Sequence, residues 1–494
     1  MFNKIKSLGT DTAIYGVSTV VGRLLTFLLT PFYTNILPPA DLGIVATVYA
    51  YIAFLNILYG YGMETAFMRY VASLEIGTKK QVFSVPFFSV AATSLVFSLC
   101  IVWGGGSIAA LISVPVDYAS IITYSAWILL LDALAIIPFA SLRMERKAKL
   151  FASLKLLNII ITVVCNLVFL LAFRWGVEGI FLSNLIASAM TLLFLLPTIL
   201  RNISAGWNPV LYKALVRFGL PIVPAYLSTM MVQVIDRPIL ESLTDMATVG
   251  IYQANYRLGI FMMLIVSMFD FAWRPFFMSN ANEPDAKQIF SRVLTYFFLV
   301  MMGSFLFMSF FISDVVTVPV YHDKSIIDPR YWGGLSIVPI VLLAYVFLGI
   351  SNTIGAGIYI EKQTKKLTIV SSTGAAVNVI VNYLLIPPLG ITGAALATLA
   401  SYVTMSAVLY VIVQKVYPMR YEYSRLLKIA VASLAVYLLA HFVRFDSLAI
   451  LWKSALLILF VVLIYLMKFF DPSELARITR LLSRQSSGRV AGKL

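Results

Sequence analysis

The sequence predicts an all-α polytopic membrane protein with about 14 transmembrane helices, in two pseudo-symmetric six-helix lobes followed by two C-terminal helices. Composition is the first reason, since 61% of the 494 residues are apolar and only 12% are charged. A soluble domain carries roughly 25% charged residues. The second reason is that long apolar runs recur along the whole chain, and the third is that Lys and Arg fall in alternate gaps between them.

The apolar runs define the expected spans, because each is long enough to cross a hydrocarbon core of ~30 Å. The first run begins near Thr10. It is too long for the core of a signal peptide and no cleavage site of small residues follows it, so we expect a retained span. The expected spans cover residues 10–36, 41–63, 82–103, 118–142, 150–173, 177–200, 215–240, 247–273, 290–314, 335–358, 367–387, 391–414, 425–443 and 450–468.

The basic residues set the expected orientation. Most lie in every second gap, and the opposite gaps hold only Arg174, Lys324, Arg330, Arg444 and Lys453. Cytoplasmic loops carry the excess of Lys and Arg. The sequence therefore predicts a multi-pass membrane protein with both termini in the cytoplasm and an even number of spans.

The net charge of +15 indicates membrane lipids as partners. Basic cytoplasmic loops face anionic lipid headgroups and account for this charge. Binding nucleic acid requires a clustered basic surface on a soluble module. No such module is expected here, so nucleic acid is not a predicted partner.

After the last span, the segment 471–474 (DPSE) is typical of a helix start, with an N-cap Asp and Pro at the first position. Leucines and arginines then fall on opposite faces, which predicts an amphipathic helix on the inner leaflet. A solvated tail is the alternative. The predicted division is 1–205 for the N-lobe (spans one to six), 206–416 for the C-lobe (seven to twelve), 417–470 for spans thirteen and fourteen, and 471–494 for the cytoplasmic tail.

Short segments of the first half recur in the second half at a nearly constant offset. The matching pairs are 42–44 (LGI) with 249–251 (VGI), Tyr49 with Tyr256, Glu145 with Glu361, Asn166 with Asn382, and 176–179 (GVEG) with 390–393 (GITG). An even number of spans per repeat keeps the orientation, so the pseudo-axis is expected along the membrane normal. Two such lobes imply a cavity between them, as in transporters, although a fold alone does not prove function.

Two arginines lie deep within spans. Arg23 is near the middle of span one, and Arg257 lies about 15 Å below the outer end of span eight. A charge inside the membrane is costly, which marks it as a functional candidate. A guanidinium group suits phosphate because it stays charged and donates two parallel hydrogen bonds. The alternative is a structural pair with Asp132 in span four or Glu64 in span two.

Other charged residues lie nearer the predicted cytoplasmic ends of spans. Arg69 and Arg274 form either a ring of cations at the cytoplasmic mouth or simple anchors of the positive-inside kind. Asp270 is expected to pair with Arg274 at i,i+4. Lys155 is close enough to the end of span five to extend towards the interface.

A group of oxygen-bearing side chains suggests a cation site. Asn378 and Asn382 share one face of span eleven, and Asp236 and Thr398 from spans seven and twelve can converge on them. Such ligands suit a small cation. The alternatives are interhelical hydrogen bonds and neutralisation of Asp236 by its neighbour Arg237.

Prolines interrupt three of the expected spans. They are Pro31 in span one, Pro221 and Pro224 in span seven, and Pro339 in span ten. Such positions bend a helix. The bends either let a lobe open or are static.

Signatures of enzymes are missing from the sequence. It contains only two histidines, no Asp-x-Asp pair and no glycine-rich loop ending in Gly-Lys-Ser/Thr. Cys100 and Cys165 lie within spans and support neither a disulfide nor a thiolate metal site. We therefore expect a transporter rather than an enzyme, with no bound cofactor.

Several segments, in order along the chain, resemble polysaccharide flippases of the Wzx type. They are residues 22–31 (GRLLTFLLTP), 37–43 (LPPADLG), 60–70 (GYGMETAFMRY), 176–179 (GVEG) and 390–393 (GITG). These flippases belong to the multidrug/oligosaccharidyl-lipid/polysaccharide exporter superfamily. The resemblance implies alternating access and transfer of undecaprenyl-diphosphate-linked oligosaccharide, such as an O-antigen unit, to the outer leaflet. It also implies ion-gradient coupling, with a polysaccharide polymerase as a further partner.

The resemblance extends to the candidate residues. Arg23 and Arg257 fall in the spans whose cavity arginines hold the diphosphate in relatives, and the last two spans resemble those that form a lipid groove. Related lipid II flippases bind sodium in the second lobe, in a layout that Asp236, Asn378, Asn382, the Ala394 carbonyl and Thr398 resemble. Asn382 stands where a carboxylate is expected. The implied coupling ion is Na⁺ or, alternatively, H⁺.

Two rival functions follow from other interpretations. A cation/drug antiporter of the same superfamily predicts a cavity dominated by carboxylates. A membrane-embedded polysaccharide polymerase or ligase predicts a large external loop with catalytic residues.

Overall fold

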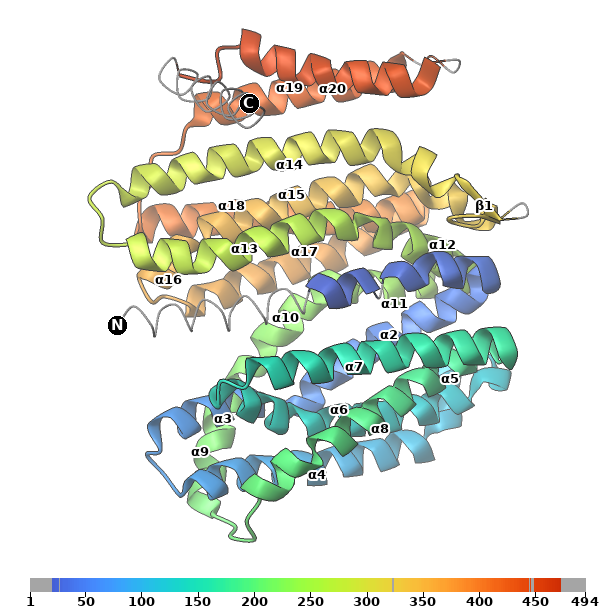
Figure 1. Ribbon diagram of the computed structural model, residues 1–494, viewed down its shortest axis with the longest axis vertical. Helices are drawn as coiled ribbons and strands as arrows, with labels where there is room; N and C mark the ends of the chain where they lie inside the picture. The colour runs from blue at the N-terminus through green and yellow to red at the C-terminus, as the bar shows by residue number, and fades with distance from the viewer. Residues whose placement is uncertain (1–19, 26, 322–323, 444, 446–447, 472–494) are drawn as a thin grey trace, which may run out of the picture. The chain divides into compact units, whose positions relative to one another are not determined.

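The computed structural model describes residues 20–25, 27–321, 324–443, 445 and 448–471, which are helical almost throughout (Figure 1). Within this part of the chain, 13 helical segments are long and apolar enough to cross a membrane. They coincide with expected spans two to fourteen, which confirms the all-α polytopic fold. Of span one, residues 20–25 and 27–36 are helical. Of the tail expected at 471–494, residues 472–494 lie outside the described residues.

The chain divides into two compact units. The first holds the described residues within Met1–Phe276 and Asp314–Tyr417, and the second those within Phe277–Ser313 and from Pro418 onward. Every site residue expected from the sequence lies in the first unit. The proposed lobe limits at residues 205 and 416 remain predictions.

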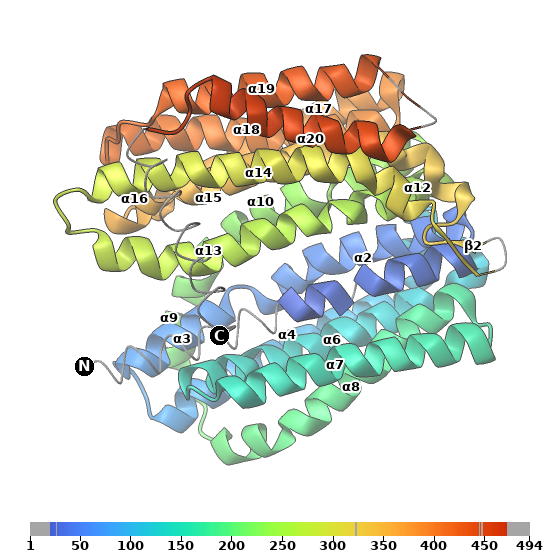
Figure 2. The same cartoon turned by 45° about the horizontal axis from the view of Figure 1, so that its top comes forward.

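One bundle of the first unit comes from the first half of the chain (Figure 2). Its helices are α2 (Pro39–Gly60), α3 (Met63–Ser73), α4 (Lys79–Trp103), α5 (Gly105–Leu111), α6 (Ser120–Met144), α7 (Ala148–Leu167) and α8 (Gly176–Asn202). Helix α6 packs against α2, α4 and α8, and α7 packs against α8. We call this group the first bundle.

A second bundle of the same unit is built from later helices. They are α10 (Val223–Val234), α11 (Asp236–Leu243), α12 (Met246–Tyr256), α13 (Ile260–Asn280), α15 (Val338–Ile354), α16 (Ala356–Ile360), α17 (Lys365–Leu389) and α18 (Ile391–Val416). Of α13, the residues up to Phe276 belong to this unit. Helix α18 packs against α15 and α17, and α10 packs against α17. A hairpin of β1 (Pro319–Tyr321) and β2 (Lys324–Ser325) and the 3₁₀ segment η5 (Pro329–Ile337) precede α15.

Span seven is broken into pieces that belong to different bundles. Helix α9 (Pro209–Gly219) packs on α3 and α4, whereas α10 packs on α17. The 3₁₀ turn η3 (Leu220–Ile222) joins them and contains Pro221, one of the prolines expected to interrupt this span. Figure 1 shows α9 beside α3, with α10 leading towards α17.

Local signals fix where the site-bearing helices begin. Asn208 caps α9 by accepting hydrogen bonds from the amides of residues 210 and 211, and Pro209 occupies its first turn. Asp245 caps α12 by accepting from the Thr248 amide. These short polar side chains satisfy amides that have no partner within the helix. Pro39 starts α2 in the same favourable first-turn position.

Helix packing uses hydrogen bonds and small residues, because lipid offers no strong hydrophobic drive for helix association. The Ser98 hydroxyl donates to the Ala126 carbonyl at 2.7 Å, and the Ser406 hydroxyl donates to the Phe347 carbonyl at 2.9 Å. Both bonds join neighbouring helices, α4 with α6 and α18 with α15. Cys100 and Cys165 are not joined in a disulfide.

The two bundles repeat the same backbone turns at the positions matched in the sequence. Gly176 and Gly390 both have positive φ, +57° and +55°. Arg146 and Lys362, which follow the matched Glu145 and Glu361, also have positive φ, 56° and 55°. Positive φ at four residues in equivalent places supports the pseudo-symmetry of the fold.

The second unit consists mainly of α14 (Ala286–Val316), α19 (Tyr423–Phe442) and α20 (Ala449–Leu466). Of α14, the residues up to Ser313 belong to this unit. The Phe305 and Tyr437 rings join α14 and α19, with centroids 5.5 Å apart. Arg425 forms an ion pair with Asp471 at 2.5 Å, and the Lys428 ammonium donates to the Lys468 carbonyl at 3.1 Å. These contacts connect the start of α19 to the end of α20.

Candidate functional site

The two deep arginines lie where span one meets span eight. Arg23 Nη1 donates to Ser267 Oγ of α13 at 2.6 Å. Arg257 Nη1 lies 3.5 Å from Thr30 Oγ1 of span one. Each arginine thus contacts the span that carries the other one. The Phe27 and Phe261 rings lie between these contacts along the chain and pack edge to face, with centroids 4.8 Å apart.

Neither arginine forms an ion pair with a carboxylate in the part of the chain that the structure describes. The two carboxylates considered as alternatives have other partners: Asp132 accepts a hydrogen bond from Ser188, and Glu64 pairs with Arg143. The structural pairing of Arg23 or Arg257 with Asp132 or Glu64 is therefore wrong. Hydroxyl partners leave a guanidinium with its full charge, which an anion can neutralise.

The backbone places Arg257 at a break in its span. Helix α12 ends at Tyr256, and the 3₁₀ turn η4 (Arg257–Gly259) separates it from α13. Tyr33 and Tyr49 are electrostatic neighbours of its guanidinium group. A small cavity of about 120 Å³ borders Arg257 and Tyr49, together with Arg237 and Gln253. Arg257 thus faces residues of both bundles.

The bundles are in close contact at one end, which we call the closed end and define by residues 35–43, 246–250 and 325–331. A Cβ atom added to Gly43 would lie 1.7 Å from the Met246 carbonyl oxygen, and one added to Gly250 would lie 1.9 Å from the Pro39 carbonyl oxygen. The Asn35 amide donates to the Ser325 carbonyl at 3.0 Å. This seal closes the end that the charge pattern predicts to be external.

Further hydrogen bonds hold the closed end. The Tyr331 hydroxyl donates to the Leu37 carbonyl at 2.8 Å, and Arg330 Nη2 lies 3.5 Å from the Thr34 carbonyl oxygen. Asp328 pairs with Arg330 at 2.8 Å, and this hydrogen bond lowers the pKa of the Asp328 carboxyl. The contacts of Tyr331 and Arg330 with Leu37 and Thr34 join the segment before α2 to the segment around η5.

Two large cavities lie at the opposite end, where the basic residues of the spans gather. One, of about 790 Å³, includes Arg217, Asp270, Arg274 and Lys365 in its lining. The other, of about 810 Å³, is bordered by Arg69, Lys213 and Arg217. Both include Arg217 and Phe218. We call them the basic cavities.

The residues expected at the cytoplasmic mouth therefore border adjoining spaces. The Arg69 guanidinium lies 4.5 Å from the centroid of the Phe218 ring. Arg274 forms the predicted i,i+4 ion pair with Asp270 at 2.9 Å, which is confirmed. Sequence reasoning missed Lys213, Arg217 and Lys365 as members of this group, because it treated them as anchors at the ends of spans.

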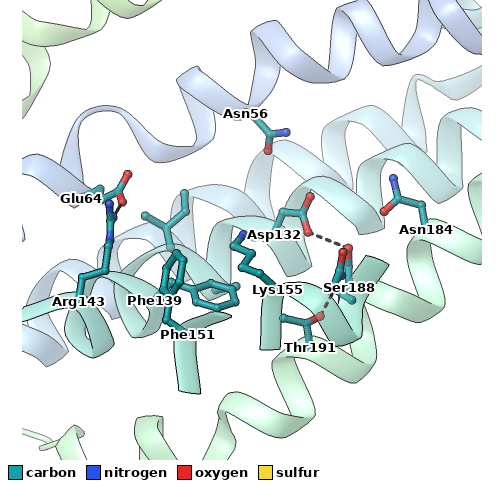
Figure 3. Close-up of a pocket in the computed structure, with 13 residues that line it drawn as sticks. Asn56, Glu64, Asp132, Phe139, Arg143, Phe151, Lys155, Asn184, Ser188 and Thr191 are labelled. Atoms are coloured by element: carbon teal, nitrogen blue, oxygen red, sulfur yellow. Dashed lines mark hydrogen bonds and ion pairs between the residues drawn. The ribbon is translucent and has the colours of Figure 1, made fainter. Parts of the chain in front are cut away.

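A third cavity, of about 440 Å³, lies within the first bundle (Figure 3). Asp132 of α6 lies in its middle and accepts a hydrogen bond from Ser188 of α8 at 2.7 Å. The Lys155 ammonium borders the same space and lies 4.3 Å from the Phe139 ring centroid. Glu64 and Arg143 form an ion pair at one side of the cavity. We call this space the first-bundle cavity.

Amide and hydroxyl groups complete its polar lining. Asn158 Nδ2 donates to Thr191 Oγ1 at 2.9 Å, and Asn184 Nδ2 donates to the Tyr49 hydroxyl at 3.0 Å. A cavity of this size with several polar partners accommodates ordered water. Asp132 thus borders a polar cavity, and no cation lies within ion-pair distance of it among the described residues.

The residues expected to bind sodium have other protein partners, and they fall into separate groups. Asp236 begins α11, and its carboxylate forms an ion pair with Arg237 at 2.6 Å and accepts a hydrogen bond from the Tyr252 hydroxyl. Thr398 Oγ1 donates to the Ala394 carbonyl at 3.3 Å. The expected neutralisation of Asp236 by Arg237 is therefore confirmed.

The amides of α17 form a separate pair. Asn382 Nδ2 donates to both the carbonyl and the Oδ1 atom of Asn378 at 2.8 Å. No hydrogen bond joins these amides to Asp236 in the described residues. No group of three or more His, Cys, Asp or Glu in that part of the chain is arranged to hold a metal ion. The set as a whole does not fit a sodium ion.

One carboxylate outside the spans has a strongly shifted pKa. Burial raises the pKa of the Glu145 carboxyl, but hydrogen bonds and charges from Lys147 and Arg201 outweigh it and lower the value to about 2. Lys147 lies 2.7 Å from Glu145. The cluster connects the turn after α6 to the end of α8.

The fold defines a class, the all-α polytopic membrane proteins. Residues 8–281 match the family described as polysaccharide biosynthesis protein, which is more than half of the chain, so the protein belongs to this family. The resemblance noted in the sequence is confirmed at this level. No curated protein sequence matched.

Solved structures of transporters share the fold. The lipid II flippase MurJ, in an inward closed conformation, aligns with a TM-score of 0.73 and 14% identity over 91% of this chain and 98% of that one. An inward-facing multidrug resistance MATE transporter aligns with a TM-score of 0.64 and 16% identity over 80% of this chain and 94% of that one.

A further structural relative comes from Pyrococcus furiosus. It is a MOP superfamily transporter described as having a binding pocket of reverse polarity. It aligns with a TM-score of 0.57 and 14% identity, covering 82% of this chain and 95% of that one. At these identities the likeness establishes the fold alone.

Proposed function

We propose that this protein is a flippase of the bacterial inner membrane that moves undecaprenyl-diphosphate-linked oligosaccharide from the inner to the outer leaflet by alternating access. The observation that carries the proposal is the crossed contact of Arg23 and Arg257 with the opposite spans, where hydroxyls rather than carboxylates face the guanidinium groups. Two such cations suit the two phosphates of the carrier lipid, because guanidinium binds phosphate by paired, charge-assisted hydrogen bonds.

The basic cavities supply the first contact with the cargo in this proposal. Arg69 and Arg217 are available there to an anionic headgroup approaching from the cytoplasm, whereas Arg274 is already paired with Asp270. Because the closed end is sealed, the cargo can enter only from the cytoplasmic side. A later step opens the closed end and releases the lipid to the outer leaflet, where a polysaccharide polymerase uses it.

An ion gradient drives the cycle in this proposal, and we favour protons over sodium. The first-bundle cavity offers Asp132 as the proton-binding group, since it borders a polar space and accepts only a neutral hydroxyl donor. The positive charge of Lys155, which borders the same cavity, repels a metal cation. No bound cofactor and no catalytic step are part of the mechanism.

The decisive experiment is flipping of a fluorescent undecaprenyl-diphosphate disaccharide in proteoliposomes. Removing one charge-assisted hydrogen bond costs about 1.5–3 kcal/mol, so we expect Arg23→Ala and Arg257→Ala each to slow flipping roughly 10–100-fold. Arg420→Ala, which removes an exposed arginine, is the matched control. Unchanged flipping in the double variant would exclude the diphosphate clamp.

The rival functions have distinct readouts. A cation/drug antiporter, suggested by the shared fold of the multidrug transporters, would extrude cationic dyes and would depend on carboxylates instead of Arg23 and Arg257. A polymerase or ligase would lengthen the glycan in vitro. Neither activity is expected of the purified protein.

A further inference from the structure

The most deeply buried charged pair described in the second bundle is Asp236 with Arg237. Asp236 is 1% exposed and Arg237 is 6% exposed. Burying two ions is costly unless they neutralise each other and their remaining hydrogen-bonding groups are satisfied. The surroundings of this pair meet that condition.

Both carboxylate oxygens of Asp236 already have donors. Oδ1 accepts from the Arg237 guanidinium at 2.6 Å and from the Arg237 backbone amide at 3.0 Å. Oδ2 accepts from the Tyr252 hydroxyl. A metal ion needs oxygen lone pairs, and every donor placed on this carboxylate competes for them.

The guanidinium group of Arg237 has further protein partners besides Asp236. It donates to the Gln233 carbonyl at 2.5 Å and to Gln253 Oε1 at 3.0 Å. Its central carbon lies 4.3 Å from the ring centroid of Tyr256 and 5.5 Å from that of Tyr252. Aromatic faces attract a cation more strongly when water is excluded.

The remaining oxygen ligands do not form a second site. Asn382 Oδ1 lacks a hydrogen-bond partner, but so does the neighbouring Asn378 Nδ2, a donor that repels a metal ion. A single water that accepts from one amide and donates to the other would satisfy both atoms. The Thr398 hydroxyl is directed to the Ala394 carbonyl.

We propose that the second bundle carries its cation covalently, as the guanidinium of Arg237, in the place opposite Asp236 that a sodium ion would otherwise take. The pair neutralises the carboxylate at all times, so this bundle keeps its polar core without a metal ion. A sodium gradient therefore has no binding site here. The cation also connects the start of α11 to α12 through Gln253, Tyr252 and Tyr256, which holds the broken span seven to the bundle.

The test measures thermal unfolding of the purified full-length protein in NaCl and in choline chloride of equal ionic strength. Wild type is expected to melt at the same temperature in both salts. Arg237→Ala removes the tethered cation, so we expect a lower melting temperature in choline chloride and a rise that saturates with Na⁺. The double variant Arg237→Ala/Asp236→Asn should lose that rise, because the charge that binds Na⁺ is gone.

Two controls complete the design. Arg201→Ala breaks another arginine–carboxylate pair, with Glu145 at the end of α8, and should show no response to Na⁺. Arg237→Lys keeps a positive charge at this position, so its melting temperature should also be independent of Na⁺. This variant is measured in place of Arg237→Ala if the alanine variant does not fold.

A sodium-dependent rise in the melting temperature of wild type that Asp236→Asn abolishes would overturn the proposal. A folded Arg237→Ala that ignores Na⁺ would also overturn it. These readouts need no cargo, so they are independent of whether the protein proves to be a flippase.

Discussion

Arginines of the first unit differ in function because different partners face them. Arg237 is matched by a carboxylate, two tyrosine rings and two amide oxygens, and its charge is used up within the fold. Arg23 and Arg257 meet hydroxyl groups and keep their charge available. Only the second kind is able to bind an external anion.

The sequence identified Arg23 and Arg257 because a charge deep within an apolar run is visible without a structure. It also raised the pairing of Asp236 with Arg237, since the two are adjacent. The tyrosine rings around Arg237 were not predictable, because α12 supplies them from positions that look like ordinary apolar packing. The basic cavities were missed for a related reason: Arg217 and Lys365 are far apart in sequence and meet only in the folded unit.

Asp132 provides a test of proton coupling. Asp132→Asn keeps the hydrogen bond from Ser188 but cannot take up a proton. In proteoliposomes with an imposed pH gradient, we expect the flipping rate of this variant to fall to the rate of wild type without a gradient. Glu283→Gln, which changes an exposed carboxylate in the turn after α13, should retain the stimulation. If Asp132→Asn still responds to the gradient, protons are coupled elsewhere.

Glu145 makes stability depend on pH in the acid range. Its pKa is about 2 in the folded protein against an ordinary 4.5, so its contribution is present above about pH 4.5 and is lost as the pH falls towards 2. Because the pair is partly exposed, Glu145→Gln should cost only about 1 kcal/mol or less near neutral pH. Melting curves of both proteins should converge between about pH 5 and 3, and a gap that persists at low pH would contradict this assignment.

At the scale of elements, the crossing of α2 and α12 is the clearest product of the duplication. Gly43 and Gly250 occupy matched positions in the two repeats, and a Cβ atom on either would collide with backbone of the other helix. Small residues permit such close approach of membrane helices. The sequence showed the repeated motif, but only the fold reveals that its two copies contact each other.

Enlarging either glycine should therefore disfavour the closed end. Overpacking of this kind costs about 1–3 kcal/mol, which moves a two-state equilibrium about 5–150-fold. We expect Gly43→Ala to expose Ala46→Cys, beside the small cavity, to a thiol reagent added from outside, in a background lacking Cys100 and Cys165. Gly106→Ala is the control, because nothing lies within 4 Å of its added Cβ. Equal labelling of the two variants would show that the crossing does not gate access.

For the whole molecule, the apolar runs were sufficient to predict the spans. Those two to fourteen match the described helices, because crossing a membrane imposes a length and a composition on every span. The breaks inside spans were less predictable. Pro221 marked the 3₁₀ turn of span seven, whereas the turn at Arg257 follows no proline and depends on its packing within the unit.

The grouping of helices was also beyond the sequence. Helix α14 belongs by sequence to the second repeat, yet most of it falls in the same compact unit as α19 and α20. Side-chain contacts between distant segments determine that grouping, such as Phe305 with Tyr437. Hydropathy reports whether a segment lies in lipid or water and contains no information about its neighbours.

Helix α9 is seated on one bundle and α10 on the other, with the turn Leu220–Ile222 between them. This short stretch is consequently a mechanical linkage, and torsion at its few dihedral angles must accompany any rotation of the halves. Phe218 and Arg217, which belong to both basic cavities, sit immediately before that pivot. Cargo bound to these residues would act directly on the turn, so that cargo binding and the rotation of the bundles become coupled.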